Sequence, residues 1–140
     1  MEIPRLGLEM PIVGVPGEGN TWDVTWLGSD AGWLEGTAYP TFPGNSVLTG
    51  HVWNADNTPG PFANLKELHY GDTVLIHIGW SVYAYEVREN RLVEPDDFSV
   101  LGHEEYDWIT LLTCQGFDER DGDYTLRRVV RAVRVSSIRD

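Results

Sequence analysis

The chain has 140 residues, the size of one ordinary domain, so we expect residues 1–140 to form a single domain. Its 22 acidic residues against 10 basic ones give a net charge of −12. This sign disfavours nucleic acid and anionic membrane surfaces as partners, because both attract Lys and Arg. A single cysteine excludes an internal disulfide and a zinc site built from several cysteines.

The predicted elements are mostly short strands. Fifteen glycines and 8 prolines separate segments rich in Val, Ile, Leu, Tyr and Thr, a pattern typical of β-structure. In chain order the predicted strands are residues 11–15, 46–50, 73–78, 81–87, 108–114 and 124–138. Gly79 and Trp80 predict a two-residue hairpin, and the apolar spacing over residues 61–68 predicts one or two helical turns. Six or more strands with little helix indicate an all-β barrel or sandwich.

Cys114 is the candidate nucleophile. It ends the predicted strand 108–114 directly before a loop, where a side chain can be held rigidly and still be reached from solvent. Two interpretations stay open for a lone cysteine, a buried apolar residue or a reactive thiol. A reactive thiol needs a neighbouring partner to act as a nucleophile.

His51 is the candidate partner of that thiol. It follows the predicted strand 46–50 and precedes a long loop, so it has the same strand-end placement as Cys114. The other histidines, His69, His77 and His103, suit structural or solvated positions better. For His51 we therefore expect a role in proton transfer.

The last predicted strand is strongly basic in an otherwise acidic chain. It carries four of the ten basic residues, Arg127, Arg128, Arg131 and Arg134. Strand alternation places Arg127 and Arg131 on one face and the other two on the opposite face. These charges either balance nearby carboxylates on an edge strand, or one guanidinium holds a substrate carbonyl or a developing oxyanion.

Five segments carry a resemblance to a known family. Residues 110–114 read Thr-Leu-Leu-Thr-Cys, and residues 127–132 read Arg-Arg-Val-Val-Arg-Ala. Together they resemble the Thr-Leu-x-Thr-Cys and Arg-x-Val-Val-x-Ala signature of the sortases, the Cys transpeptidases of the bacterial cell surface. Three more segments match sortase patterns in the expected order and extend the similarity over nearly the whole chain: residues 44–51, 62–72 and 93–101.

The resemblance implies a closed eight-stranded β-barrel with one or two short helices. It assigns His51, Cys114 and Arg127 as the catalytic residues. Arg128 is the second choice for the arginine, because the doubled arginine leaves the register open by one residue.

The resemblance also implies a substrate and a reaction. Val93, Pro95 and Leu112 fall where sortases line the groove for a sorting peptide. The implied enzyme cleaves a Leu-Pro-x-Thr-Gly-like signal through a thioester on Cys114 and passes the acyl group to an amine of a cell-wall peptide or a pilin lysine. We expect a monomeric catalytic domain without a cofactor. We also expect no metal, because the acidic residues 118–123 do not fit the calcium-loop template.

Location and two alternatives remain as expectations. Sortases are usually held at the extracellular face of the cytoplasmic membrane by an N-terminal helix, which the 140 residues do not contain, so we expect a trimmed or missing anchor. One alternative is a hydrolytic cysteine peptidase on the same scaffold. The other is a non-catalytic barrel that binds peptide or glycan through its tryptophans, with Cys114 merely buried.

Overall fold

The computed structural model describes residues 1–18, 21–54, 56, 58–94, 97–113 and 126–139. Two predicted site residues, Cys114 and Pro95, and the acidic segment 118–123 lie outside this part. The strands are β1 (Glu2–Ile3), β2 (Leu8–Glu9), β3 (Ile12–Val15), β4 (Gly17–Glu18), β5 (Thr21–Trp22), β6 (Ala31–Leu34), β7 (Gly44–Gly50), β8 (Thr73–Ile78), β9 (Ser81–Val93), β10 (Asp107–Thr113) and β11 (Arg127–Arg139). The helices of the described residues are all 3-10 turns: η1 (Pro4–Leu6), η2 (Leu65–Glu67) and η3 (Phe98–Leu101).

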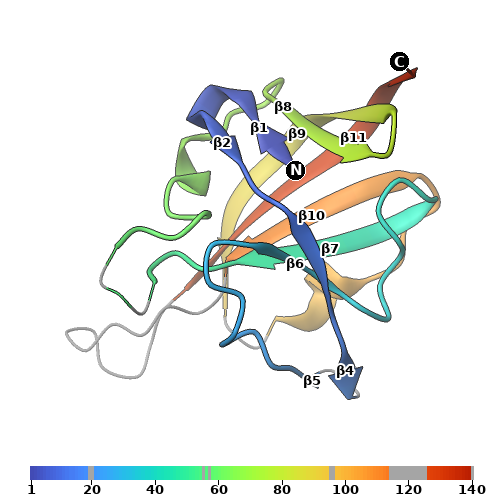
Figure 1. Cartoon of the computed structure of the whole chain (residues 1–140). Helices are drawn as coiled ribbons and strands as arrows, with labels where there is room; N and C mark the ends of the chain where they lie inside the picture. The colour runs from blue at the N-terminus through green and yellow to red at the C-terminus, as the bar shows by residue number, and fades with distance from the viewer. Residues whose placement is uncertain (19–20, 55, 57, 95–96, 114–125, 140) are drawn as a thin grey trace.

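Nine of the strands form one curled sheet (Figure 1). Their order is β2-β1-β8-β9-β11-β10-β7-β6-β3, and β4 and β5 form a separate two-stranded sheet. Neighbours in the large sheet are antiparallel except for the parallel pairs β7–β10 and β3–β6. The predicted all-β architecture is confirmed. Within the described residues the sheet ends, β2 and β3, do not pair with each other, so the sheet forms a half-barrel.

The sheet buries apolar side chains on both of its faces. The inner cluster joins residues from opposite ends of the sheet, as a concave face requires. It consists of Met1, Ile3, Met10, Ala31, Leu48, Phe62, Leu65, Leu68, Val74, Ile76, Tyr85, Val87, Ile109, Leu111, Val130 and Ala132. The outer cluster lies on the other face and consists of Val15, Leu27, Leu34, Val47, Val93, Val100, Leu112 and Val129. Consecutive strand residues therefore belong to different clusters, because side chains alternate across a strand.

Most predicted elements have their expected place. The strand predicted at 73–78 coincides with β8, and the helical turns predicted at 61–68 contain η2, with Phe62, Leu65 and Leu68 buried on one face. The strand predicted at 81–87 continues as β9 to Val93, because β9 pairs with β11 along its whole length. Strand β6 was not predicted from the sequence, because it is short and contains Gly32.

Gly32 has a packing reason. A Cβ atom at this position would lie 2.7 Å from Cγ2 of Val15, so only glycine lets β6 approach the side chains of the outer cluster.

Candidate functional site

The ends of β7 and β10 define the candidate site. The two strands run parallel and in register, and Gly50 at the end of β7 pairs with Thr113 at the end of β10. In addition, the hydroxyl of Thr49 donates a hydrogen bond of 2.7 Å to the carbonyl of Leu112. His51 is the next residue after β7. In the sequence Cys114 directly follows Thr113, and it lies outside the described residues.

The backbone of His51 is fixed by the returning loop. Its carbonyl accepts a hydrogen bond of 3.0 Å from the amide of Phe62, a fully buried member of the inner cluster. A Cβ atom at Gly60 would lie 2.1 Å from the same carbonyl oxygen, so the close approach of the loop requires glycine there. The half-buried His51 therefore sits at a defined position beside the strand ends.

Arg127 begins β11 on the face of the outer cluster. It pairs with Val93 of β9, and two residues further along β11 Val129 pairs with Leu112 of β10. The Nε atom of Arg127 is buried and has no hydrogen-bond partner in the structure as described. A buried donor without a partner is costly, so this guanidinium is available to an acceptor that binds beside it.

Arg128 points to the opposite face and is already engaged. Its Nη1 donates a hydrogen bond of 3.1 Å to Oδ1 of Asn90, and its amide donates one of 2.9 Å to Oγ1 of Thr113. Asn90 in turn donates to the carbonyls of Leu65 and Leu68, at 3.0 and 2.8 Å. Arg128 therefore ties β11 to β10 and, through Asn90, to the η2 turn. The geometry separates two arginines that the sequence alone leaves ambiguous.

Two of the three predicted groove residues are described, and the structure places them together. Val93 and Leu112 belong to the outer cluster and are buried next to Val100 of η3. Pro95 lies outside the described residues. Val93 is also the strand partner of Arg127.

A polar network near these residues was not predicted from the sequence. Asn45 of β7, Arg131 of β11 and Glu104 lie on the outer face and hold the connection between β9 and β10. The available signal was an asparagine directly before the apolar strand predicted at 46–50, because an amide side chain that is buried beside such a strand must find partners inside the fold.

A buried carboxylate lies at the opposite end of β10. Oδ1 of Asp107 accepts a hydrogen bond of 2.7 Å from the hydroxyl of Tyr85, and Oδ2 lies 3.3 Å from Nε of Arg134. Burial raises the pKa of Asp107, against the effects of the Tyr85 hydroxyl and the Arg134 charge. Burial also raises the pKa of Tyr85. Asp107 and Thr113 lie at opposite ends of β10, so the Asp107–Tyr85 pair is remote from the candidate site. We therefore assign this pair a role in stability.

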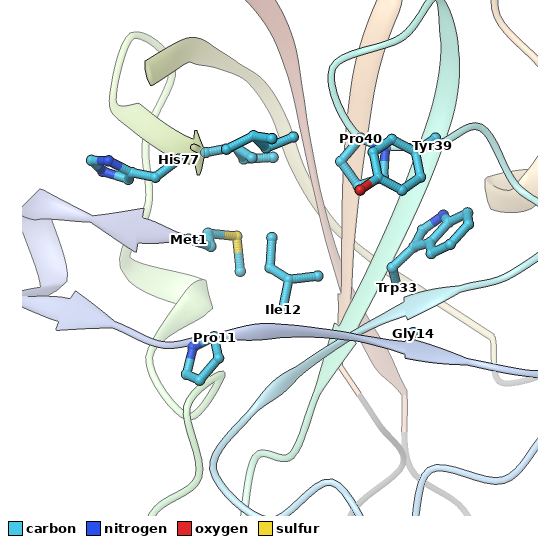
Figure 2. A pocket seen from close by; sticks show the side chains of 10 residues that line it. Met1, Pro11, Ile12, Gly14, Trp33, Tyr39, Pro40 and His77 are labelled. Atoms are coloured by element: carbon cyan, nitrogen blue, oxygen red, sulfur yellow. The ribbon is translucent and has the colours of Figure 1, made fainter. Parts of the chain in front are cut away.

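A cavity of about 440 Å³ lies where the half-barrel is open (Figure 2). Residues of β3 and β8 line it together with Met1, Trp33 and Tyr39, and none of the predicted site residues does. At its rim Nε2 of His77 lies 3.1 Å from Oε1 of Glu2, which fits the structural role predicted for this histidine.

The described residues contain no cluster of three or more His, Cys, Asp or Glu side chains that could hold a metal ion. They also contain no helix of the length and apolarity needed to cross a membrane.

Comparison with known proteins identifies the family. The model of the Sortase domain matches residues 1–135. Sortase D of Bacillus subtilis (strain 168) is 33% identical over 119 residues, which are 84% of this chain and 54% of that protein. Sortase A of Staphylococcus aureus (strain NCTC 8325 / PS 47) is 29% identical over 93 residues, 65% of this chain and 45% of that protein. The chain thus spans about half the length of these curated relatives.

The solved structures agree. The crystal structure of sortase C-1 from Actinomyces oris superposes with a TM-score of 0.78 at 30% identity, covering 96% of this chain and 71% of that one. The chain belongs to the sortase family, whose members are known as cysteine transpeptidases that act at the cell surface.

Proposed function

We propose that this chain is the catalytic domain of a cysteine transpeptidase that cleaves a Leu-Pro-x-Thr-Gly-like sorting signal and transfers its acyl part to an amine. The observation that carries the proposal is the register at the strand ends. Gly50 pairs with Thr113, so His51 follows one strand directly beside the end of the strand that precedes Cys114 in the sequence. Family membership supports the same reaction class.

The proposed first half-reaction forms a thioester. The thiolate of Cys114 attacks the carbonyl carbon of the scissile peptide bond, and a C–S bond forms while the carbonyl oxygen takes up the negative charge. Arg127 donates hydrogen bonds to this oxyanion. When the intermediate collapses, the C–N bond breaks and the imidazolium of His51 gives its proton to the leaving amine.

The second half-reaction reverses these roles. The incoming amine attacks the thioester carbon, and neutral His51 accepts the proton that the amine loses. A new peptide bond forms, the C–S bond breaks and the thiolate of Cys114 is restored. No cofactor is needed, because every proton and electron pair is balanced between the peptide, the amine and these two side chains.

The choice of Arg127 rests on the contrast with Arg128. The Nε of Arg127 is buried and lacks a partner among the described side chains and backbone, whereas Arg128 bonds Asn90 and Thr113. An oxyanion would supply the missing acceptor for Arg127. Recruiting the guanidinium of Arg128 would instead break its hydrogen bond to Asn90.

We extend the proposal to the peptide groove and the location. Val93 and Leu112, on the face that also carries Arg127, contact the apolar part of the sorting signal. Pro95, which lies outside the described residues, is assigned to the same groove. The nucleophile is an amine of a cell-wall peptide or a pilin lysine. The domain works as a monomer at the extracellular face of the bacterial cytoplasmic membrane.

Mass spectrometry of the protein incubated with a Leu-Pro-x-Thr-Gly-type peptide library and triglycine tests this function. We expect an acyl adduct on Cys114 and a product in which triglycine is joined to the threonine. The Cys114→Ala variant should form neither, which controls for other nucleophiles.

The other outcomes contradict specific parts of the proposal. Cleavage without a ligated product would favour a hydrolytic peptidase on this scaffold. Absence of an adduct, together with a Cys114 thiol that iodoacetamide alkylates only after unfolding, would favour a non-catalytic binding protein.

A further inference from the structure

In the connection between β9 and β10, residues 97–106 contribute to the outer face of the sheet. Its 3-10 turn η3 buries Val100 in the outer cluster, which also contains Val93 and Leu112. The position of η3 therefore decides how the two proposed groove residues are covered.

Asn45 fastens this connection to β7. Its Nδ2 donates to the carbonyl of Val100 at 2.9 Å and to the carbonyl of Gly102 at 2.8 Å. Its Oδ1 accepts a hydrogen bond of 2.6 Å from the hydroxyl of Thr110 on β10. Asn45 is only 3% exposed, so one buried amide group holds the C-terminal end of the η3 turn.

Arg131 makes the second attachment. Its Nη2 lies 2.6 Å from Oε2 of Glu104, its guanidinium carbon lies 4.5 Å from the ring centroid of Trp108, and its Nε donates to the hydroxyl of Thr110 at 3.3 Å. The Arg131 side chain is 14% exposed, so its charge is largely removed from water. Thr110 joins the two attachments, since it bonds both Asn45 and Arg131.

A second carboxylate, that of Glu89, also contacts Arg131 and can be compared with Glu104. Glu89 of β9 lies 3.5 Å from Nη1 of the same arginine, on the sheet itself and not in the connection. Its side chain is 44% exposed, compared with 36% for Glu104. Of the two carboxylates that contact Arg131, only that of Glu104 belongs to the connection.

We propose that Asn45, Arg131 and Glu104 form a clamp that fixes η3 over Val93 and Leu112 and thereby sets the affinity for the sorting peptide. This inference rests on the proposed function. The three are positioning residues, which act through η3 and not on the reacting atoms. Loosening the clamp lowers the fraction of molecules with an assembled groove, and the apparent affinity falls by the same fraction.

A matched pair of variants, Glu104→Ala and Glu89→Ala, tests the clamp. Each removes one carboxylate from Arg131, but only the first removes an attachment of the connection, while Asn45 still holds it in both variants. In Glu104→Ala we expect KM for the peptide to rise about fivefold while kcat stays within about twofold of the wild type. In Glu89→Ala both constants should stay within about twofold. Backbone hydrogen exchange over residues 97–104 should accelerate in Glu104→Ala alone.

The outcomes separate this inference from the proposed function. Equal KM values and equal exchange in the two variants, with an active wild type, would overturn the clamp and leave the transpeptidase intact. A wild type that forms no adduct would overturn the proposed function, and with it the proposed effect on peptide affinity. In that case the hydrogen-exchange data would still test whether Glu104 attaches η3 to the sheet. Faster exchange with unchanged KM would also overturn the proposal, because η3 would then not set the affinity.

Discussion

The two faces of the sheet are filled in different ways. The inner cluster is the larger apolar core, and strand alternation also places buried polar side chains on its face, among them Ser46, bonded to the carbonyl of Ala38, and Asp107, bonded to Tyr85. The outer cluster is smaller and borders buried polar side chains, among them Asn45, Thr49 and Thr110. The concave face is closed by the curl of the sheet, whereas the outer face depends on η3 and neighbouring segments for cover. Buried polar groups on both faces need hydrogen-bond partners, but on the outer face these partners include the segment that covers it, as the bonds of Asn45 to Val100 and Gly102 show.

This difference shows how one strand can serve stability and the proposed site at once. Leu111 and Leu112 are neighbours in β10, yet the first belongs to the inner cluster and the second to the outer one. Arg127 and Arg128 divide in the same way in β11, one with an unpartnered buried Nε and one hydrogen-bonded into the fold. Substitutions at adjacent positions should therefore have different kinds of effect.

The largest effect is expected for the arginine pair. Arg127→Ala should lower kcat/KM about a thousandfold, close to 4 kcal/mol, because the oxyanion loses its donor, with little change in the free energy of unfolding. Arg128→Ala should cost about 1–2 kcal/mol of stability through the lost bond to Asn90 and leave kcat/KM within about threefold. Steady-state kinetics and urea unfolding measure both. A greater kinetic loss in Arg128→Ala would reverse the assignment.

The leucine pair gives the next effect. Leu111→Ala should lower the free energy of unfolding by about 3 kcal/mol, because the side chain is 0% exposed and leaves a cavity in the inner cluster. Its KM at a temperature where it is folded should match the wild type. Leu112→Ala should also lose stability, but with KM for the peptide raised about threefold or more. Equal changes of KM in both variants would contradict the claim that only the outer face of β10 contributes to peptide binding.

The smallest effect sharpens the comparison at the far end of β10. Burial raises the pKa of Asp107, so the folded state binds its proton more tightly than the unfolded state does. This group therefore adds stability as the pH falls from neutral through its raised pKa towards the ordinary value of about 3.9. Denaturation at several pH values should show wild type gaining stability relative to Asp107→Asn as the pH falls. The opposite slope would mean that Arg134 outweighs burial.

Much of this fold could be predicted from the sequence because its strands are short apolar segments between turn residues. The strand-end placement of His51 is confirmed, since β7 ends at Gly50. By contrast, β6 escaped prediction because Gly32 reads locally as a strand breaker, and only its contact with Val15 explains it.

The candidate site could be predicted less completely. A doubled arginine has no internal signal for register, and only the pairing of β11 with β9 and β10 places Arg127 on the outer face. The contact of Asn45 with Val100 joins residues 55 positions apart, which no local pattern encodes. The roles assigned to the site residues in the reaction all stay predictions: His51, Cys114 and Arg127 in catalysis, and Val93, Pro95 and Leu112 in peptide binding.

The parallel pairing of β7 with β10 has a consequence for how the chain acquires its proposed activity during folding. Thr49 and its partner Leu112 are 63 positions apart, and β11, which carries Arg127, is the last strand of the described residues. Contacts of such sequence separation carry a large loop-closure cost and form late compared with local hairpins. A chain still being synthesised therefore holds a cysteine without its assembled surroundings. We expect the proposed reactivity towards a sorting peptide only once β7, β10 and β11 have all paired.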